Sequence, residues 1–220
     1  MTAVSFGAAA SDLTGSGPAE PPAGSLAFLA VELHRIGAVR FGDFVLKDGR
    51  HSPFYIDLRV LIGHPAVLRN VAHAMIASAA SLPYDCLAGI PYAGLPLAVA
   101  MSLEGGRPLV YARKEAKAYG TQRQVEGVFQ RGDRALVIDD VITTGGAKLE
   151  AIVPLRAAGL VVEDILVVVD REQSGAQALA EGGLRLHSVL KVTALLDRLQ
   201  AAAVVSAADA ERARAFIAQG

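Results

Sequence analysis

Residues 135–147 constrain the fold of this chain more than any other segment. Four apolar residues, Ala135 to Ile138, precede two carboxylates and a turn of small residues, and a helical pattern begins near Ala147. A short apolar run of this kind is typical of a buried parallel strand. A small-residue loop before a helix points several backbone N–H groups at one place, where the helix dipole adds positive charge. The segment therefore predicts a strand, a phosphate-binding loop and a helix, with the loop formed by Thr143, Thr144, Gly145 and Gly146.

The acid pair Asp139-Asp140 is expected where this strand ends. Phosphate alone gives no reason for two carboxylates, whereas a ligand that also carries hydroxyls does, as a ribose phosphate would. A hydrated Mg²⁺ nearby would offset the negative charge. The alternative is an ordinary tight turn in a doubly wound sheet, but such a turn needs no acid pair before its hydroxyl residues.

An alternation of strands and helices indicates an α/β fold with a central parallel sheet flanked by helices. A helix over 25–38, with Ser25 as its N-cap, is expected first, followed by a hairpin of strands 41–50 and 54–59. We expect this small N-terminal helix and hairpin to form a hood over the site. Ligands of such sheets bind at the carboxyl ends of the strands. The remaining expected elements are helices 67–81, 95–104, 147–158 and 176–182, strands 85–90, 108–112, 125–129, 134–139, 161–169 and 185–190, and closing helices from about 193 and 208.

Composition favours a soluble small-molecule enzyme. Hydrophobic residues make up 52% of the 220 residues, the net charge is −1, and the apolar runs are too short to span a bilayer. We therefore expect neither nucleic acid nor membrane as a partner. Residues 107–134 carry a local excess of seven Lys and Arg over three acids, which suits a small polyanion. The five histidines show no metal-ligand spacing.

The single cysteine, Cys86, lies in an apolar stretch and is expected in the core, in a protein of the reducing cytoplasm. Residues 1–24 are rich in Ala, Gly, Ser and Pro and lack the pattern of a secretory signal. We interpret them as a disordered tail before one domain over 25–220.

Several motifs occur together in one order along the chain. These are Phe41-Gly-Asp-Phe-Val-Leu-Lys47, Ser52-Pro-Phe-Tyr-Ile-Asp-Leu-Arg59, Arg113-Lys-Glu-Ala-Lys117, the acid-pair segment, and Asp170-Arg-Glu-Gln173. From about Phe28 to Phe216 the chain resembles the orotate phosphoribosyltransferases, members of the type I phosphoribosyltransferase family. It is similar above all to the transferase domain of uridine monophosphate synthases. The resemblance implies the type I phosphoribosyltransferase fold.

The acid-pair motif resembles the site for phosphoribosyl pyrophosphate (PRPP) throughout the larger family. The cations Arg113, Lys114 and Lys117 resemble those of a mobile loop that meets the pyrophosphate, partly in the neighbouring subunit of a homodimer. Cations there stabilise the charge that pyrophosphate gains as its bond to ribose breaks. The resemblance implies a catalytic role for Arg113, Lys117, Asp139 and Asp140. It implies PRPP contacts by Lys47, Tyr92, Ala93, Arg113, Lys114, Lys117, Tyr119, Asp139, Asp140, Val141, Ile142, Thr143, Thr144, Gly145, Gly146 and Ala147.

For the second substrate, the resemblance implies that Tyr55, Ile56, Thr143 and Arg171 bind orotate. A planar guanidinium suits a planar acid ring with several acceptors. If the family resemblance is set aside, Arg171 could equally well form a structural ion pair. Tyr55 and Ile56 could then simply be core residues of the hairpin.

The sequence departs from the family at two positions. Ala93 stands where some relatives carry Lys, and Ala118 stands where the mobile loop of relatives usually carries Asp. The missing carboxylate at position 118 bears on loop closure and turnover more than on the identity of the ligands.

The implied reaction is orotate plus PRPP to orotidine 5′-monophosphate and pyrophosphate, a step of pyrimidine biosynthesis. Mg²⁺ is the implied cofactor, held mainly by PRPP and water near Asp139 and Asp140, with no direct protein ligand. Two alternatives remain open at this point: a phosphoribosyltransferase for another base, and a non-catalytic ligand-sensing relative.

Overall fold

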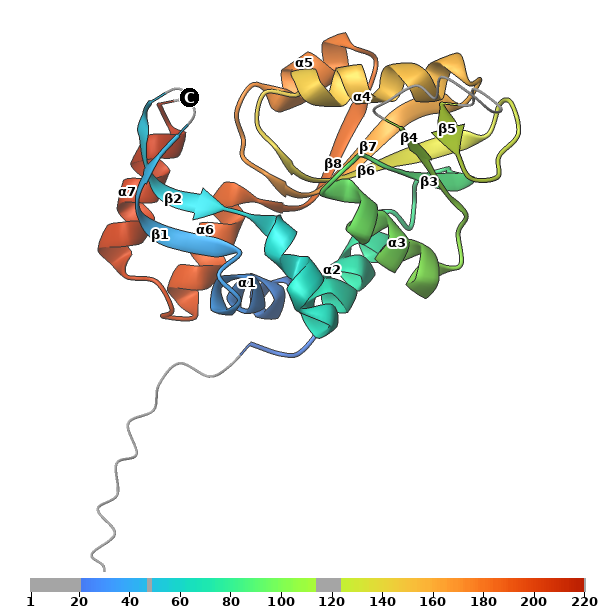
Figure 1. Ribbon diagram of the computed structural model, residues 1–220. Helices are drawn as coiled ribbons and strands as arrows, with labels where there is room; N and C mark the ends of the chain where they lie inside the picture. Colours follow the sequence, from blue (N-terminus) through green and yellow to red (C-terminus); the bar gives the residue numbers. More distant parts are fainter. Residues whose placement is uncertain (1–20, 47–48, 114–123, 220) are drawn as a thin grey trace, which may run out of the picture.

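A computed structural model describes residues 21–46, 49–113 and 124–219. Its main sheet has six strands in the order β5-β4-β3-β6-β7-β8 (Figure 1). All neighbouring pairs are parallel except β4 with β5, which is antiparallel. The bounds are β3 Cys86–Gly89, β4 Leu109–Ala112, β5 Val125–Glu126, β6 Arg134–Ile142, β7 Val161–Asp170 and β8 Arg185–Lys191. The α/β fold predicted from the sequence is confirmed.

Helices cover both faces of this sheet (Figure 1). One face carries α2 (Pro65–Ser78) and α3 (Gly94–Gly105), and the other carries α4 (Gly146–Ala157) and α5 (Gly175–Glu181). Successive residues of a strand point to opposite faces, so β6 supplies both cores. Leu136 and Ile138 belong to the core on the α2 and α3 side, whereas Ala135 and Val137 belong to the core on the α4 side. This two-sided burial explains the continuous apolar run in the sequence.

The strand order reverses at β3. The chain passes from β3 to its neighbour β4 on one side, and later returns to β6 on the other side. The loops that follow β3 and β6 therefore leave the sheet in opposite directions from adjacent positions. Such a reversal opens a crevice at the carboxyl edge of a parallel sheet.

The hood combines both ends of the chain. The hairpin of β1 (Val39–Val45) and β2 (His51–Ile56) follows α1 (Leu26–Arg35), and the helices α6 (Val192–Ala201) and α7 (Ala207–Ile217) pack beside them (Figure 1). The ring of Phe54 in β2 meets that of Phe216 in α7 edge to face, with centroids 6.1 Å apart. The prediction of a purely N-terminal hood was therefore incomplete, because the C-terminal helices supply much of its apolar surface.

Several element boundaries differ from the sequence predictions; strand β2, for example, spans His51–Ile56 rather than 54–59. Ser25 caps α1 as predicted, accepting a hydrogen bond from the Phe28 amide, but the helix ends at Arg35, before Gly37 with its φ of +74°. Strand β1 ends at Val45. Strand β5 has only two residues, because Gly127 follows with a φ of +104°. Strand β6 pairs with β7 as far as Ile142, so the acid pair lies within this strand rather than after it.

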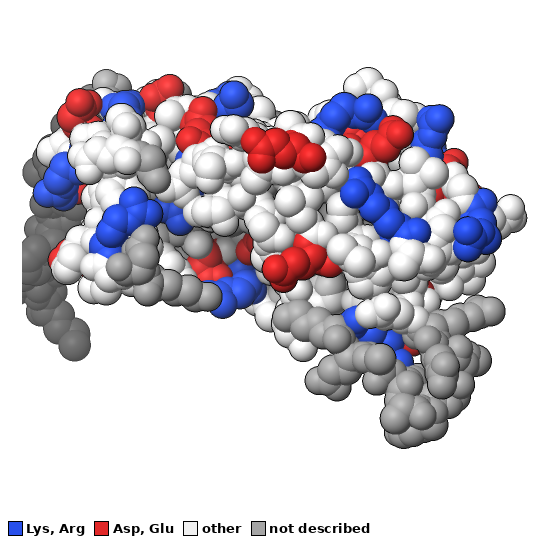
Figure 2. Space-filling model, turned by 90° about the horizontal axis from the view of Figure 1, so that it is seen from above, with Lys and Arg blue, Asp and Glu red and all other residues white. Residues whose placement is uncertain are grey.

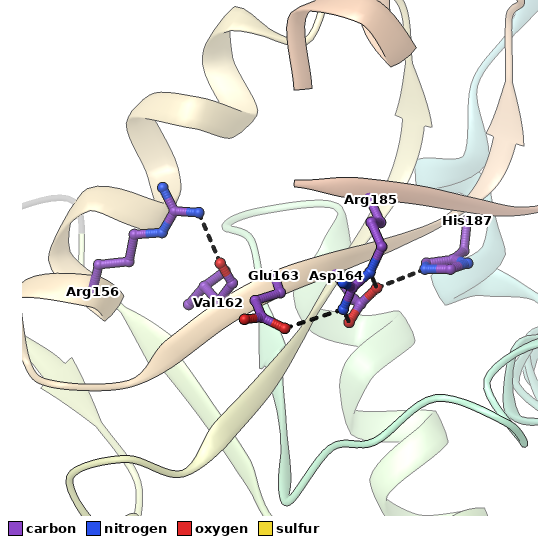
Figure 3. A network of polar contacts seen from close by, with 6 residues as sticks. All are labelled: Arg156, Val162, Glu163, Asp164, Arg185 and His187. Carbon is purple, nitrogen blue, oxygen red and sulfur yellow. Dashed lines mark hydrogen bonds and ion pairs between the residues drawn. The ribbon is translucent and has the colours of Figure 1, made fainter. Parts of the chain in front are cut away.

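A polar network lies toward the amino ends of β7 and β8, away from the crevice (Figure 3). The Asp164 carboxylate accepts hydrogen bonds from Arg185 (2.7 and 2.8 Å) and lies 2.8 Å from Nε2 of His187. Asp164 is buried, and these contacts hold its pKa below the ordinary value. The network joins β7 to β8 at the edge of the sheet.

The prediction that Cys86 lies in the core is confirmed. Cys86 is buried in β3, and desolvation raises the pKa of its thiol to about 11. Acidic and basic side chains are interspersed over the described part of the face drawn in Figure 2. No helix in the described ranges has the length and apolar character needed to cross a membrane.

Candidate active site

A groove of about 560 Å³ lies at the reversal of strand order. Its lining comes from the loop after β3, from the end of β4 and the residues that follow it, from the acid pair in β6, and from α4. The structure thereby brings together residues that the sequence placed in separate motifs. The lining includes Ile90, Pro91, Ala93, Arg113, Asp139, Asp140, Ala147 and Lys148.

Close packing of α3 against β6 fixes one wall of this groove. A Cβ on Gly94 would stand 2.3 Å from the carbonyl oxygen of Ile138 and 3.1 Å from Cα of Asp139. Only glycine permits this approach. Consequently the 90–93 loop, which includes a cis peptide bond between Pro91 and Tyr92, is held directly beside the acid pair.

The two carboxylates are not equivalent. Asp139 is buried, with 4% of its surface exposed, whereas Asp140 is partly exposed. Oδ1 of Asp139 accepts a hydrogen bond from the Asp140 amide (2.9 Å), and its Oδ2 lies 2.5 Å from Nζ of Lys148. Burial raises the pKa of Asp139 to about 6, although Lys148 opposes the shift. Oδ1 of Asp140 accepts a hydrogen bond from the Val141 amide (2.7 Å).

The predicted phosphate loop leads directly into α4. Gly145 precedes this helix with a φ of +82°, and the helix begins at Gly146. The amides of the first helical turn have no partners within the helix and so remain able to bind an anion. A Cβ on Gly175 would lie 2.8 Å from the carbonyl oxygen of Thr143, so α5 packs closely against this loop.

The side chains in this segment face different ways. Thr143 and Val141 are half-buried, and Thr144, Gly146 and Ala147 are exposed. Ile142 is fully buried in the core on the α4 side. A contact of Ile142 with a ligand would therefore involve its main chain.

Arg113 adds a cation to the groove. It follows β4, and its NH1 lies 3.5 Å from Oε1 of Glu126. That nitrogen is buried and has no hydrogen-bond partner among the described residues. Tyr92 instead projects beside an adjoining apolar groove of about 240 Å³ lined by η1 (Leu58–Gly63) and α3, with 75% of its surface exposed.

Arg171 leaves the end of β7 toward the hood. Its guanidinium carbon lies 5.3 Å from the ring centroid of Phe54. Burial and the nearby Arg50 lower its pKa, and no carboxylate of the described residues pairs with it. The next residue, Glu172, has a φ of +56° and accepts hydrogen bonds from the amide and hydroxyl of Thr193. That contact ties the loop to the start of α6.

The two predicted hairpin residues occupy successive positions of β2. Tyr55 stacks on Phe44, with centroids 5.5 Å apart, and Arg40 lies over both rings. Ile56 is half-buried and packs on the core. Because Phe54 and Tyr55 are adjacent in a strand, their side chains point to opposite faces. Arg171 therefore contacts the face that carries Phe54, not the face that carries Tyr55.

Part of the predicted site lies outside the described residues. These positions are Lys47 in the hairpin and Lys114, Lys117, Ala118 and Tyr119 in the predicted mobile loop. The described part of the chain shows no cluster of three or more His, Cys, Asp or Glu that would hold a metal ion.

Sequence reasoning missed Lys148. Its signal is its position in the first turn of α4, where the helix dipole disfavours a cation. A lysine there needs a compensating acid, and the nearest acids upstream in the sequence are Asp139 and Asp140.

Comparison with known proteins extends over most of the chain. Orotate phosphoribosyltransferase of Cenarchaeum symbiosum is 43% identical over 177 residues, 79% of this chain and 88% of the relative. Uridine 5′-monophosphate synthase of Bos taurus is 40% identical over 194 residues, 87% of this chain. The structure of Leishmania donovani UMP synthase superposes with a TM-score of 0.82 at 38% identity, over 89% of this chain. No protein-family model matched the sequence.

The relatives differ in how much of their own length is matched. The chain spans 40% of the bovine protein and 42% of the Leishmania protein, but 88% of the archaeal transferase. The match therefore corresponds to the transferase unit. With the parallel sheet, the acid pair at its strand reversal and the glycine loop before α4, these similarities show that the chain belongs to the orotate phosphoribosyltransferase family and has the type I phosphoribosyltransferase fold.

Proposed function

We propose that this chain transfers the 5-phosphoribosyl group of PRPP to orotate, giving orotidine 5′-monophosphate and pyrophosphate. The observation that carries the proposal is one groove that brings together the acid pair, the half-buried Arg113 and the start of α4. A glycine loop precedes that helix start, and Arg171 lies over Phe54 of the hood. These groups match the three chemical parts of PRPP and the acidic ring of orotate.

In this proposal each part of PRPP has its own partner. The amides before and in the first turn of α4 bind the 5′-phosphate, and the acid pair accepts hydrogen bonds from the ribose hydroxyls. Arg113 meets the pyrophosphate. As the bond from ribose C1 to pyrophosphate breaks and the bond to the orotate nitrogen forms, charge grows on pyrophosphate, and the cation stabilises it. Little general-base chemistry is needed, so positioning carries most of the catalysis.

Arg171 is proposed to bind orotate. Its side chain is half-buried, its guanidinium lies over an aromatic ring, and it has no carboxylate partner among the described residues. An anionic, planar ligand with several acceptors would compensate that charge. A neutral purine would leave it uncompensated, which favours orotate over the purine bases.

Mg²⁺ is the proposed cofactor, carried mainly by PRPP. The site fits a hydrated cation because Asp140 is partly exposed beside a second carboxylate. Asp140 and Asp139 would hold the metal through water. When bound, the ion would neutralise part of the pyrophosphate charge.

We also propose a cytoplasmic homodimer whose loop of residues 113–124 serves the neighbouring subunit. Support for an association surface comes from large apolar side chains beside the groove. Ile62 in η1 and Tyr92 both line the adjoining apolar groove and expose 66% and 75% of their surface. Val99 and Leu103 in α3 expose 45% and 80%. Surfaces of this kind commonly mark subunit interfaces.

The test is an orotate-depletion absorbance assay. Purified protein should consume orotate only when PRPP and Mg²⁺ are both present. A panel with adenine, hypoxanthine and uracil tests the alternative of another base, and equal or faster reaction with one of them would contradict the substrate assignment. Absence of turnover together with tight PRPP binding would instead favour a ligand-sensing relative.

A further inference from the structure

The pair Lys148–Asp139 is an unusual feature of the groove. Nζ of Lys148 lies 2.5 Å from Oδ2 of Asp139, and their side chains are only 15% and 5% exposed. Burying two charges costs free energy that is recovered only with good geometry and further hydrogen bonds. The lysine also opposes the dipole of α4, because it stands in the first helical turn. Neither local helix preference nor general stability explains its presence there.

The pair makes the two acids unequal. Both oxygens of Asp139 are engaged, one by Lys148 and the other by the Asp140 amide. Asp140 uses Oδ1 to accept from the Val141 amide, and within the described ranges its Oδ2 has no hydrogen-bond partner. The partly exposed acid therefore keeps a free oxygen, while the buried acid is held from two sides.

From this geometry we propose that Lys148 is a positioning residue of the active site. Its ammonium group fixes the Asp139 carboxylate and balances its charge, which leaves Asp140 as the acid that meets the ribose hydroxyls and the hydrated metal of PRPP. This inference rests on the proposed function, since it concerns the same groove.

The charge balance of the groove gives the expected consequence. Arg113, Lys148, Asp139, Asp140 and Glu150 line it, and Glu126 lies against Arg113. Without Lys148, two adjacent carboxylates face a polyanionic ligand, and their repulsion is strong in a site partly shielded from water. More Mg²⁺ is then needed to bring PRPP into the groove.

The experiment measures PRPP binding by isothermal titration calorimetry without orotate, over a series of Mg²⁺ concentrations. Lys148→Met removes the cation at similar length, and Lys148→Arg keeps it. Asp139→Asn and the double variant Asp139→Asn/Lys148→Met test whether the lysine acts through Asp139. Arg212→Met, which removes an exposed cation from α7, is the control for total charge. Thermal unfolding of each variant reports stability separately.

We expect Lys148→Met to bind PRPP at least about tenfold more weakly at limiting Mg²⁺ and to need a higher Mg²⁺ concentration for half-maximal binding. Lys148→Arg should stay within about threefold of the wild type, and Arg212→Met should be unchanged. The double variant should have the same Mg²⁺ dependence as Asp139→Asn alone, because the charge that Lys148 balances is then absent.

Three results would overturn the inference. The first is an unchanged Mg²⁺ dependence in a folded Lys148→Met variant. The second is a further loss of affinity when Lys148→Met is added to Asp139→Asn, which would show that the lysine binds the ligand directly. This comparison remains valid if Lys148→Met alone does not fold, since the double variant buries no unpaired charge. The third is equal loss in Lys148→Arg and Lys148→Met. By contrast, a wild-type protein that binds no PRPP at any Mg²⁺ concentration would contradict the proposed function itself.

Discussion

The guanidinium of Arg171 lies over the ring of Phe54, with its central carbon 5.3 Å from the ring centroid. This contact links the end of β7 to the hairpin of the hood, across the carboxyl edge of the main sheet. A cation over an aromatic face gains electrostatic energy, and the gain grows as water is removed.

The first prediction concerns this residue. Arg171→Lys keeps the charge but loses the planar fork, so we expect the KM for orotate to rise at least about tenfold, about 1.4 kcal/mol in binding. The affinity for PRPP should remain nearly unchanged. Steady-state kinetics with orotate varied, and calorimetry with PRPP alone, measure the two effects. Arg156→Lys is the control, because Arg156 donates a hydrogen bond to the Val162 carbonyl (Figure 3) and is not among the residues that line the groove. Similar KM values for the two variants would argue against a role in orotate binding.

The second prediction concerns the acid pair. Replacing Asp139 and Asp140 together by Asn keeps their shape but removes two charges, and we expect kcat/KM to fall at least about tenfold, a loss of about 1.4 kcal/mol in transition-state stabilisation. If the kinetics of a folded variant are unchanged, the acid pair is part of an ordinary turn and has no role in catalysis.

In the wild type, kcat/KM for PRPP should decrease as the pH falls through about 6, because the raised pKa of Asp139 leads to its protonation.

The third prediction concerns the packing of α3 on β6. Gly94→Ala would place a methyl group 2.3 Å from the carbonyl oxygen of Ile138, so the helix or the strand must shift. We expect a loss of about 2–4 kcal/mol in the free energy of unfolding. Gly63→Ala is the matched control, since nothing lies within 4 Å of a Cβ at that position. Urea unfolding of both variants tests the prediction, and equal stability would show that α3 adapts without cost.

The fourth prediction concerns the network of Asp164, Arg185 and His187 (Figure 3). Because the folded-state pKa of Asp164 is lowered, its contribution to stability is present above its unfolded pKa and is lost as the pH falls through the folded value. Asp164→Asn should therefore cost about 1–3 kcal/mol at pH 7. The difference from wild type should shrink in strongly acidic solution. A constant difference from pH 7 to pH 3 would show that packing, not charge, explains the loss.

Much of the fold follows from local sequence patterns. The apolar run before Asp139, the glycine loop and the N-cap Ser25 predicted their elements correctly, because each depends on a short stretch of chain. Contacts between distant segments were harder to predict. The place of α7 in the hood depends on the contact between Phe216 and Phe54. No local sequence pattern indicates that these two residues are in contact.

The candidate site, too, was predicted only in part from the sequence. Asp139, Asp140 and Arg113 were predicted, and the structure places them in one groove. The pairing of Lys148 with Asp139 was missed, although the position of a lysine in the first turn of a helix is a readable signal. The position of Arg171 over Phe54 rather than beside Tyr55 was also missed, because it depends on how the hood sits over the sheet.

The last prediction concerns the proposed sharing of loop cations between subunits. If Lys117 of one chain completes the site of its neighbour, then a Lys117→Ala chain and a chain with Asn at positions 139 and 140 are each defective in a different half of one site. A mixed dimer then contains one site with both halves intact. Mixing the two defective proteins should raise the activity, up to about a quarter of the wild type per total subunit if exchange is random. The activity should appear at the rate of subunit exchange, which fluorescence transfer between labelled chains measures. Mixing either variant with itself is the control, and exchange without recovered activity would show that the loop serves its own subunit.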